Sequence, residues 1–249
     1  RVVIKSDGSF TYLAPDIAYH RDKYQRGFTR LVNLWGPDHH GYINRLKAAV
    51  AALDRPADSL SILIVQLATI FKEGKPIQMS TRKGQYITLR EVLDEVGCDA
   101  ARFFFIMRRI SSHLDFDLDT AKKQTPENPV YYIQYAHARI SSILRASSLS
   151  LKPEEASFSL LKEKEELGLI KAVWRFPFVI EGCAKALDPY MLTVYLQELA
   201  EAFHKFYDTR RVLGQDEKIT AVRLGLLKAA QTVIAAGLEL AGVSCPESM

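Results

Sequence analysis

The sequence predicts an α/β fold in the first half of the chain and an all-α fold in the second half. Two observations support this division. Short β-branched runs alternate with segments of helical periodicity up to about residue 125, whereas the later residues show only the 3.6-residue period. Two prolines within residues 122–129 separate these regions, because proline interrupts a helix. We therefore expect two domains, residues 1–125 and residues 126–249.

In the first half, the alternation predicts strands at residues 31–35 and 61–65 and helices at residues 43–53 and 88–97. The second helix should begin with a capping box, in which the Thr88 hydroxyl accepts from the Glu91 amide and the Glu91 carboxylate reaches back. Gly97 is a plausible end for it. Strand, helix, strand and helix in this order favour a parallel sheet with helical crossovers.

The second half consists of long segments with helical periodicity that end in Gly, Pro or Ser clusters. These segments are residues 131–149, 163–187, 189–213 and 220–241. Short connections between long helices are typical of a helical bundle.

Composition indicates a soluble globular protein. Of its 249 residues, 48% are hydrophobic and 25% are charged. The longest apolar run, residues 60–71, is broken by polar residues and is shorter than the roughly 20 residues of a membrane-spanning helix. The three cysteines are scattered, so we expect reduced thiols and a cytoplasmic location without membrane attachment.

Basic residues are concentrated in the first half. Residues 1–125 hold 19 Lys and Arg against 14 Asp and Glu, and residues 126–249 hold 14 against 15. A polyanionic partner is compatible with this excess, which is too small to demonstrate one.

A polar loop follows the first predicted strand, at residues 36–41. Gly36 permits close backbone approach, and Asp38 offers a carboxylate to both hydroxyls of a ribose. His39 and His40 can donate to a phosphate or carboxylate. The alternative is a polar loop with a helix cap at Asp38. The two histidines have no third metal ligand nearby, so we predict no metal site here.

Two further segments could bind ligands. Residues 78–84 combine a hydroxyl pair, two adjacent cations and a glycine, which would suit a loop closing over pyrophosphate; the alternative is a solvated basic turn. Tyr12 and Asp16 would face one pocket if the segment between them is helical. A carboxylate beside an aromatic ring suits a guanidinium.

The first helix of the second half carries aromatic and basic residues on one face. Tyr132, Tyr135 and Arg139 recur at three- and four-residue spacing, and Tyr207 and Arg211 form a second such pair. Such faces can stack unpaired bases. The alternative is a set of core aromatics beside arginines that extend to solvent.

These segments, in this order, resemble one family, the arginyl-tRNA synthetases of class I. Residues 79–84 with Ile87-Thr88-Leu89 look like the family's version of the KMSKS loop, and residues 35–41 look like its nucleotide-binding segment after a Rossmann strand. Residues 128–139 are similar to the start of its anticodon-binding domain, and the chain ends on methionine as the family typically does. The resemblance implies the second half of a Rossmann-type catalytic domain followed by a helical-bundle anticodon-binding domain.

The resemblance also implies a role for each matching position. The enzyme would activate arginine with ATP and Mg²⁺ and transfer it to tRNA(Arg). Catalytic residues would be Ser80, Arg82 and Lys83; ATP would be bound by Gly36, Asp38, His39 and Met79; arginine would be bound by Tyr12 and Asp16; and tRNA would be bound by Tyr132, Tyr135, Arg139, Tyr207, Arg211 and Met249.

The sequence contains no match to the family's HIGH motif. We therefore expect that the N-terminal half of the same enzyme, with its first Rossmann half, would precede Arg1, and that this chain is inactive alone. Its absence should leave apolar surface exposed on the incomplete sheet and favour association, although the native enzyme is expected to be a monomer. Two alternatives remain open: a free-standing tRNA-binding module, and a cysteinyl-type class I synthetase with a zinc site.

Overall fold

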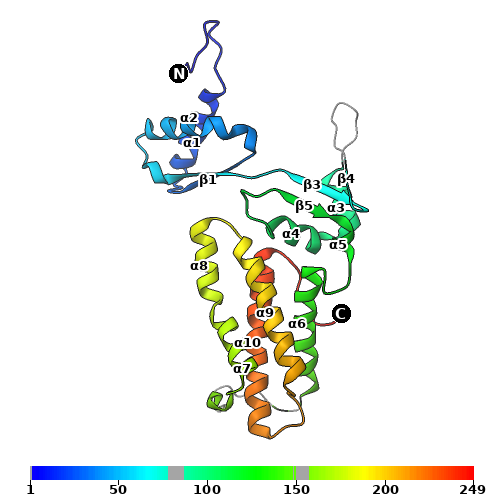
Figure 1. The fold of residues 1–249 in the computed structure, drawn as a ribbon. Helices are drawn as coiled ribbons and strands as arrows, with labels where there is room; N and C mark the ends of the chain where they lie inside the picture. Colours follow the sequence, from blue (N-terminus) through cyan, green and yellow to red (C-terminus); the bar gives the residue numbers. More distant parts are fainter. Residues whose placement is uncertain (1, 78–86, 148, 150–156) are drawn as a thin grey trace. The chain divides into compact units, whose positions relative to one another are not determined.

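The computed structural model describes residues 2–77, 87–147, 149 and 157–249, and the chain divides into two compact units. The first unit comprises residues 1–68 and 110–114. The second comprises residues 69–109 and 115–249. The predicted α/β and all-α regions are both present (Figure 1).

The first unit is built on two parallel strands. Its elements are α1 (Leu13–Gln25), β1 (Leu31–Trp35), η1 (Pro37–Tyr42), α2 (Ile43–Ala51), η2 (Ala57–Ser59) and β2 (Leu60–Ile64). β1 and β2 pair in register from Leu31 with Leu60 to Trp35 with Ile64. The core beneath them is formed by Tyr24, Leu31, Leu46, Val50 and Leu60. The predicted β–α–β order and parallel pairing are confirmed.

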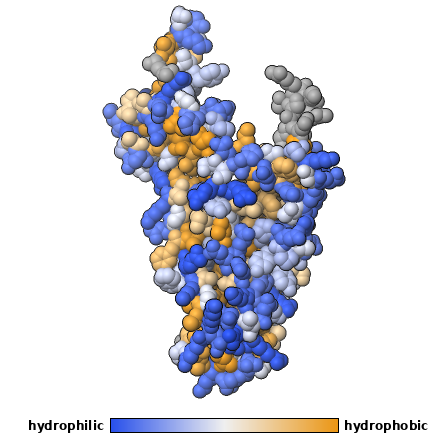
Figure 2. Space-filling model, viewed as in Figure 1, coloured by the Kyte–Doolittle hydropathy of each residue, from blue (hydrophilic) through white to orange (hydrophobic). Residues whose placement is uncertain are grey.

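One face of β1 lacks cover among the described residues. Leu31 and Asn33 are buried, whereas Val32 and Leu34 between them are exposed. Figure 2 shows hydrophobic residues interspersed with hydrophilic ones on the visible surface of the chain. Apolar surface is therefore exposed on this sheet as predicted, and the association that it would favour stays a prediction.

The second unit begins with a small sheet and three helices. The sheet has the strand order β4–β3–β5, with β3 (Ala68–Lys72), β4 (Lys75–Pro76) and β5 (Leu114–Asp117). β3 and β4 form an antiparallel hairpin whose turn residue Gly74 has a φ of 69°. The helices are α3 (Leu89–Val96), α4 (Cys98–Ile106) and α5 (Leu118–Lys122). Both bonds of the predicted capping box at Thr88 are present, and α3 stops at Gly97.

The rest of the second unit is a helical bundle. It contains α6 (Pro129–Ala146), η5 (Phe158–Leu160), α7 (Lys164–Trp174), α8 (Phe176–Ala186), α9 (Tyr190–Thr209) and α10 (Glu217–Ala241). α9 lies at its centre and contacts α6, α7, α8 and α10 (Figure 1). Leu196, Leu199, Phe203 and Phe206 of α9 are fully buried there. No strand follows Asp117 among the described residues.

The helix α10 is long and apolar enough to cross a membrane by length and composition. Half of its most apolar 18-residue window is buried, however, and it packs against α6, α7 and α9. It also carries Arg223, which is paired with a buried carboxylate on α7. These contacts identify α10 as a core helix of the bundle.

The prediction of one helix over residues 163–187 is wrong. Two helices occupy this range, α7 and α8, and Arg175 lies between them. Arg175 keeps a helical backbone conformation, but Pro177 follows at the start of α8. Proline has no N–H to donate and its ring clashes with the preceding turn, so it can open a helix but not continue one.

Several elements were not predicted from the sequence, namely α1, α4, α5 and the β4–β3–β5 sheet. The predicted domain boundary near residue 125 stays a prediction. Residues 115–125 belong to the same compact unit as the bundle, as do residues 69–109.

Candidate functional site

The loop after β1 presents an exposed carboxylate and an exposed imidazole. β1 ends at Trp35, and η1 starts directly after Gly36. A Cβ atom on Gly36 would lie 2.8 Å from Oδ1 of Asp38, so a larger residue here would require the carboxylate to move. The side chains of Asp38 and His39 are 79% and 59% exposed, and their Oδ2 and Nε2 atoms are 3.6 Å apart. The loop lies at the carboxyl end of a parallel strand, where α/β proteins bind ligands.

The alternative role of Asp38 as a helix cap is wrong. The cap position of η1 is Gly36, and η1 has no side-chain cap. α2, which follows, starts after Tyr42 and also lacks a side-chain cap. The Asp38 carboxylate is therefore not used by either helix terminus and is open to solvent.

Asp16 on α1 is connected to this loop through Tyr42. The Tyr42 hydroxyl donates to Oδ2 of Asp16 at 2.8 Å. The Tyr42 ring lies 5.9 Å from Trp35, which in turn lies 6.0 Å from His39. Burial, reinforced by the bond to Asp16, raises the pKa of Tyr42 to about 12, so its hydroxyl remains a donor at neutral pH. Two predicted groups of site residues are thus joined by a residue that the sequence did not single out.

Tyr12 and Asp16 occupy the start of α1, as the helical interpretation of this segment requires. Tyr12 is the N-cap residue and is 91% exposed, whereas Asp16 is partly buried within the first turn. The Asp16 partner in the structure is Tyr42 rather than Tyr12. Tyr12 therefore offers an exposed aromatic ring near Asp16 without contributing to the packing.

A buried hydrogen-bond chain anchors α1 to β1. Nδ1 of His20 lies 2.8 Å from the Asp16 carbonyl oxygen, and Nε2 lies 3.0 Å from Nδ2 of Asn33. A carbonyl oxygen only accepts and an amide nitrogen only donates, so Nδ1 carries the hydrogen and Nε2 accepts. Both His20 and Asn33 are buried, and their bonds hold the Asp16 backbone against the strand.

A second candidate site lies on the bundle, where α6 and α9 meet. The His204 ring lies 4.6 Å from Tyr132 and 5.8 Å from Tyr135, stacked on the latter at 17°. The Arg139 guanidinium lies 4.7 Å from the centre of the Tyr207 ring and donates to the Tyr207 hydroxyl. Four predicted residues are therefore brought together on two helices.

His204 is the residue of this cluster that the sequence reasoning missed. It precedes Tyr207 by three positions on α9 and so shares its helix face, which is the signal that could have identified it. Burial lowers its pKa, and Nε2 has no hydrogen-bond partner among the described residues. The alternative of core packing is partly right, because Tyr132 is half-buried and burial raises its pKa, while Tyr135 remains exposed.

Arg211 lies beside a cavity at the end of α9. The cavity has a volume of about 680 Å³ and is lined by Ile143, Tyr207, Asp208, Thr209, Arg210, Arg211, Val212, Leu213 and Gly214. Tyr207 and Arg211 both line this cavity, but α9 ends at Thr209 and Arg210 is extended, so the shared helix face expected from their four-residue spacing is wrong. The Arg211 carbonyl oxygen accepts from Nη1 of Arg223 at 2.7 Å, which fixes the backbone while the side chain stays exposed.

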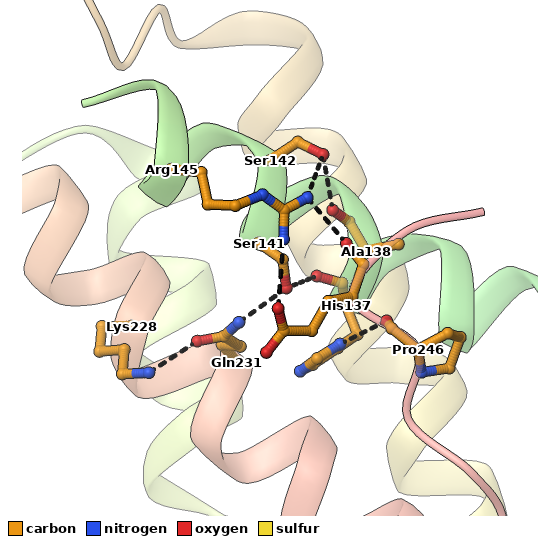
Figure 3. A network of polar contacts seen from close by, with 9 residues as sticks. His137, Ala138, Ser141, Ser142, Arg145, Lys228, Gln231 and Pro246 are labelled. Carbon is orange, nitrogen blue, oxygen red and sulfur yellow. Dashed lines mark hydrogen bonds and ion pairs between the residues drawn. The ribbon is translucent and has the colours of Figure 1, made fainter.

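The C-terminal tail is bound along α6 (Figure 3). Nε2 of Gln134 donates to the Ser244 carbonyl at 3.0 Å, and Nδ1 of His137 lies 2.9 Å from the Pro246 carbonyl. Nη2 of Arg145 donates to the carbonyl oxygen of Glu247 at 3.0 Å. These contacts, spread over three turns of α6, fix the path of the tail.

Met249 therefore lies at a defined place, apart from Tyr207 and Arg211. It lines a cavity of about 650 Å³ together with residues of α3, α4, α5 and α6, among them Lys122, Lys123, Tyr131 and Gln134. Lys122 pairs with Glu95, and Lys123 pairs with Glu127. Of the predicted tRNA-binding residues, Met249 is the one that contacts this separate cavity.

The predicted catalytic segment lies outside the described residues. This applies to Met79, Ser80, Arg82 and Lys83. Within the described ranges, no group of three or more His, Cys, Asp or Glu side chains could hold a metal ion. A Mg²⁺ ion that entered with a nucleotide would be bound mainly by the nucleotide's phosphates, since Mg²⁺ commonly needs only one or two protein carboxylates.

Comparison with known proteins gives two family matches in one chain. Residues 1–110 match the catalytic domain of class I tRNA synthetases of type R, and residues 133–249 match the DALR anticodon-binding domain. The arginine–tRNA ligase of Syntrophotalea carbinolica is 50% identical over 253 residues, covering 100% of this chain and 46% of the relative. That of Bacillus pumilus is 49% identical and has 45% of its length covered. The chain therefore spans about half the length of the curated relatives that it matches.

Solved structures agree with these matches. One described as an arginyl-tRNA synthetase from Campylobacter jejuni aligns with a TM-score of 0.90 at 34% identity, covering 100% of this chain and 54% of the other. The arginyl-tRNA synthetase of Thermus thermophilus shares the fold, with a TM-score of 0.84 at 23% identity, and has 51% of its chain covered. The matched relatives are arginine enzymes, which argues against the cysteinyl-type alternative.

Proposed function

Because this chain belongs to the arginyl-tRNA synthetase family, we propose that it supplies part of the active site and the anticodon-binding domain of an arginine–tRNA ligase. The observation that carries this proposal is the connection of Asp16 to the loop of Asp38 and His39 through Tyr42. One carboxylate suited to a guanidinium and another suited to a ribose are held in a single compact unit. Arginine and ATP are the ligands that such a pair would bind.

The proposed chemistry begins with attack of the arginine carboxylate on the α-phosphorus of ATP. A bond forms between a carboxylate oxygen and phosphorus, the bond to pyrophosphate breaks, and pyrophosphate leaves with its charge. Tyr12 and Asp16 bind arginine, and Gly36, Asp38, His39 and Met79 bind ATP. Ser80, Arg82 and Lys83 stabilise the charge that develops on the phosphates, which is catalysis by positioning and electrostatics. Mg²⁺ would neutralise phosphate charge in the same step.

The second unit is proposed to bind tRNA(Arg). Aromatic rings and guanidinium groups can stack on the unpaired bases of a single-stranded loop. Tyr135 and Arg211 are exposed on the bundle, Tyr132 contacts the His204 ring on which Tyr135 stacks, and Arg139 donates to Tyr207. Met249 would contribute from the separate cavity that it lines. A cytoplasmic location, no membrane attachment and a monomeric native enzyme complete the proposal.

The chain alone is proposed to be inactive, because it would provide only half of the ATP site. The test mixes the chain with a separately expressed N-terminal half of a related arginyl enzyme and measures arginine-dependent aminoacylation of tRNA. Activity only in the mixture supports the proposal, provided that Asp38→Asn in this chain abolishes it. Activity of the chain alone, or a mixture indifferent to Asp38→Asn, would overturn it.

A free-standing tRNA-binding module is the second candidate. It is favoured by one observation, that the α6–α9 face lies entirely within the second unit. Filter binding of tRNA to the chain across a salt series distinguishes the two functions. Tight binding with a steep salt slope favours the module, whereas weak binding with a shallow slope rejects it, because phosphate contacts supply most non-specific affinity.

A further inference from the structure

Tyr42 occupies the junction between the two ligand-binding elements of the first unit. It is the last residue of η1, whose loop carries Asp38 and His39, and its hydroxyl reaches α1. Its ring packs against the core cluster and lies 5.9 Å from Trp35, with the Arg45 guanidinium 5.7 Å from the ring centre. Because these groups contact the Tyr42 ring, packing sets the direction in which its hydroxyl points.

We propose that Tyr42 is a positioning residue for amino-acid recognition, which holds Oδ2 of Asp16 and leaves Oδ1 for a guanidinium. This inference rests on the proposed function of Asp16. The described residues make no hydrogen bond to Oδ1, whereas Oδ2 already accepts from the phenol. Oδ1 then offers both of its lone pairs to the guanidinium, whereas Oδ2 keeps one beside its bond to the phenol.

The Tyr42 hydroxyl is not needed to anchor α1. The His20 bonds to the Asp16 carbonyl and to Asn33 already join the helix to β1, and both residues are buried. Those bonds fix the backbone of Asp16, but they leave its side chain free to rotate about χ1 and χ2. The phenol is the group that selects the orientation of the carboxylate, which is the property that a ligand would sense.

Two substitutions of Tyr42 distinguish the role of its hydroxyl from the role of its ring. Tyr42→Phe removes the bond to Asp16 and keeps the ring against Trp35 and the core cluster. Tyr42→Ala removes both contacts and so disturbs the Trp35–His39 pair as well. The phenylalanine variant should therefore change recognition of arginine alone, and the alanine variant should change recognition of both arginine and ATP.

The experiment measures tRNA-dependent ATP–pyrophosphate exchange. It uses the natural full-length protein in which these 249 residues occur. Tyr42→Phe should raise the KM for arginine about tenfold, because a carboxylate that is no longer held in place weakens its charged hydrogen bond to the guanidinium, and such a bond is worth roughly that factor or more. The kcat and the KM for ATP should stay within about twofold of the parent values. The matched control is Tyr19→Phe, at an exposed tyrosine on α1, the helix that carries Asp16, and it should change none of these constants.

Asp16→Asn and thermal unfolding make the outcomes distinguishable. If Asp16→Asn leaves the KM for arginine unchanged, the proposed function of Asp16 is wrong and the role of Tyr42 falls with it. If Asp16→Asn raises that KM and Tyr42→Phe does not, only the positioning role is overturned. A lowered melting temperature in Tyr42→Phe with equal rises in both KM values would also overturn it, because that is the result of a structural defect.

Discussion

Glu166 on α7 and Arg223 on α10 form an ion pair inside the helical bundle. Oε1 of Glu166 lies 2.8 Å from both Nε and Nη2 of Arg223, and the two residues are 0% and 8% exposed. Oε2 of Glu166 accepts from the backbone N–H of Glu163 at 2.9 Å, and Nη1 of Arg223 donates to the Arg211 carbonyl. One buried pair thus joins the start of α7, the loop after α9 and the first third of α10.

Removing one partner of this pair should destabilise the second unit strongly. Glu166→Ala leaves the Arg223 guanidinium buried without a carboxylate, which costs about 3–5 kcal/mol. Urea unfolding of the chain, followed by circular dichroism, measures the loss. The matched control is Glu181→Ala, which breaks the exposed Lys185–Glu181 pair on α8 and should cost less than about 0.5 kcal/mol. Equal losses in the two variants would show that burial of the pair does not matter.

Two helical glycines should respond in opposite directions to alanine. A Cβ atom on Gly237 of α10 would lie 2.6 Å from Cδ2 of Leu196, a fully buried side chain of α9. Overpacking of this kind costs about 1–3 kcal/mol, which exceeds the gain of at most about 1 kcal/mol in helix propensity. Gly182 of α8 has nothing within 4 Å of the added atom, so Gly182→Ala gains propensity without a clash.

Thermal unfolding of the two variants checks this prediction. Gly237→Ala should lower the melting temperature, and Gly182→Ala should raise it slightly. The double variant Gly237→Ala with Leu196→Val tests the cause. The smaller side chain relieves the contact, so Gly237→Ala should lower the melting temperature less in a Leu196→Val background than in the parent. A melting temperature that rises in both glycine variants would contradict the packing explanation.

The predicted elements that the structure confirms have strong local signals. The strands at residues 31–35 and 61–65 are short apolar runs with a helix between them, and Thr88 with Glu91 is a cap that needs no distant partner. By contrast, α1 has a weakly amphipathic sequence in which only His20 and Tyr24 are buried, so its periodicity gave no signal. In the β4–β3–β5 sheet, the pairing of β3 with β5 joins residues more than 40 positions apart, which periodicity does not report.

The candidate sites divide in the same way. Asp38 and Arg211 could be selected from residue type and position, and both are exposed in the structure. Tyr42 could not, because its importance comes from its bond to Asp16 on another element. The spacing of His204 from Tyr207 marks a shared helix face, but the contacts of His204 with Tyr132 and Tyr135 lie on another helix. Spacing along one helix identifies a shared face, but it does not say which second helix covers that face.

The stability of the second unit should depend on pH through His204. Burial places the folded-state pKa of His204 below its usual value of 6.5, with smaller opposing effects from the Tyr132 backbone and Asp208. The unfolded chain therefore binds this proton at a higher pH than the folded chain does. The stability contributed by the neutral form is fully present above the unfolded-state pKa and is lost as the pH falls through the folded-state pKa.

His204→Phe isolates this contribution, because a phenylalanine ring can still stack on Tyr132 and Tyr135 but does not titrate. The unfolding free energies of the parent and the variant are measured in urea between about pH 7.5 and pH 5.5, where an unperturbed histidine titrates. The parent should lose more stability than the variant across this range. Parallel curves would mean that protonation of His204 is equally favourable in the folded and unfolded chain.

Removal of the tail should separate its effect on stability from its effect on tRNA binding. Deletion of residues 246–249 removes the bonds from His137 to the Pro246 carbonyl and from Arg145 to Glu247, and should cost about 1–3 kcal/mol in urea unfolding. Met249→Ala keeps both bonds and should leave stability within about 0.5 kcal/mol of the parent, because the side chain is mostly exposed.

Measurements of tRNA binding then show whether the tail contributes to tRNA affinity as well as to stability. If Met249 contributes to the proposed tRNA surface, Met249→Ala should weaken tRNA binding by about three- to tenfold, as expected when one apolar contact to a base is lost. The exposed Leu240→Ala on α10 is the matched control, since it removes a similar apolar side chain from a residue outside the proposed surface. Weaker binding in the deletion but not in Met249→Ala would assign the tail to stability alone, because the affinity would then follow the folding of α6 rather than the terminal side chain.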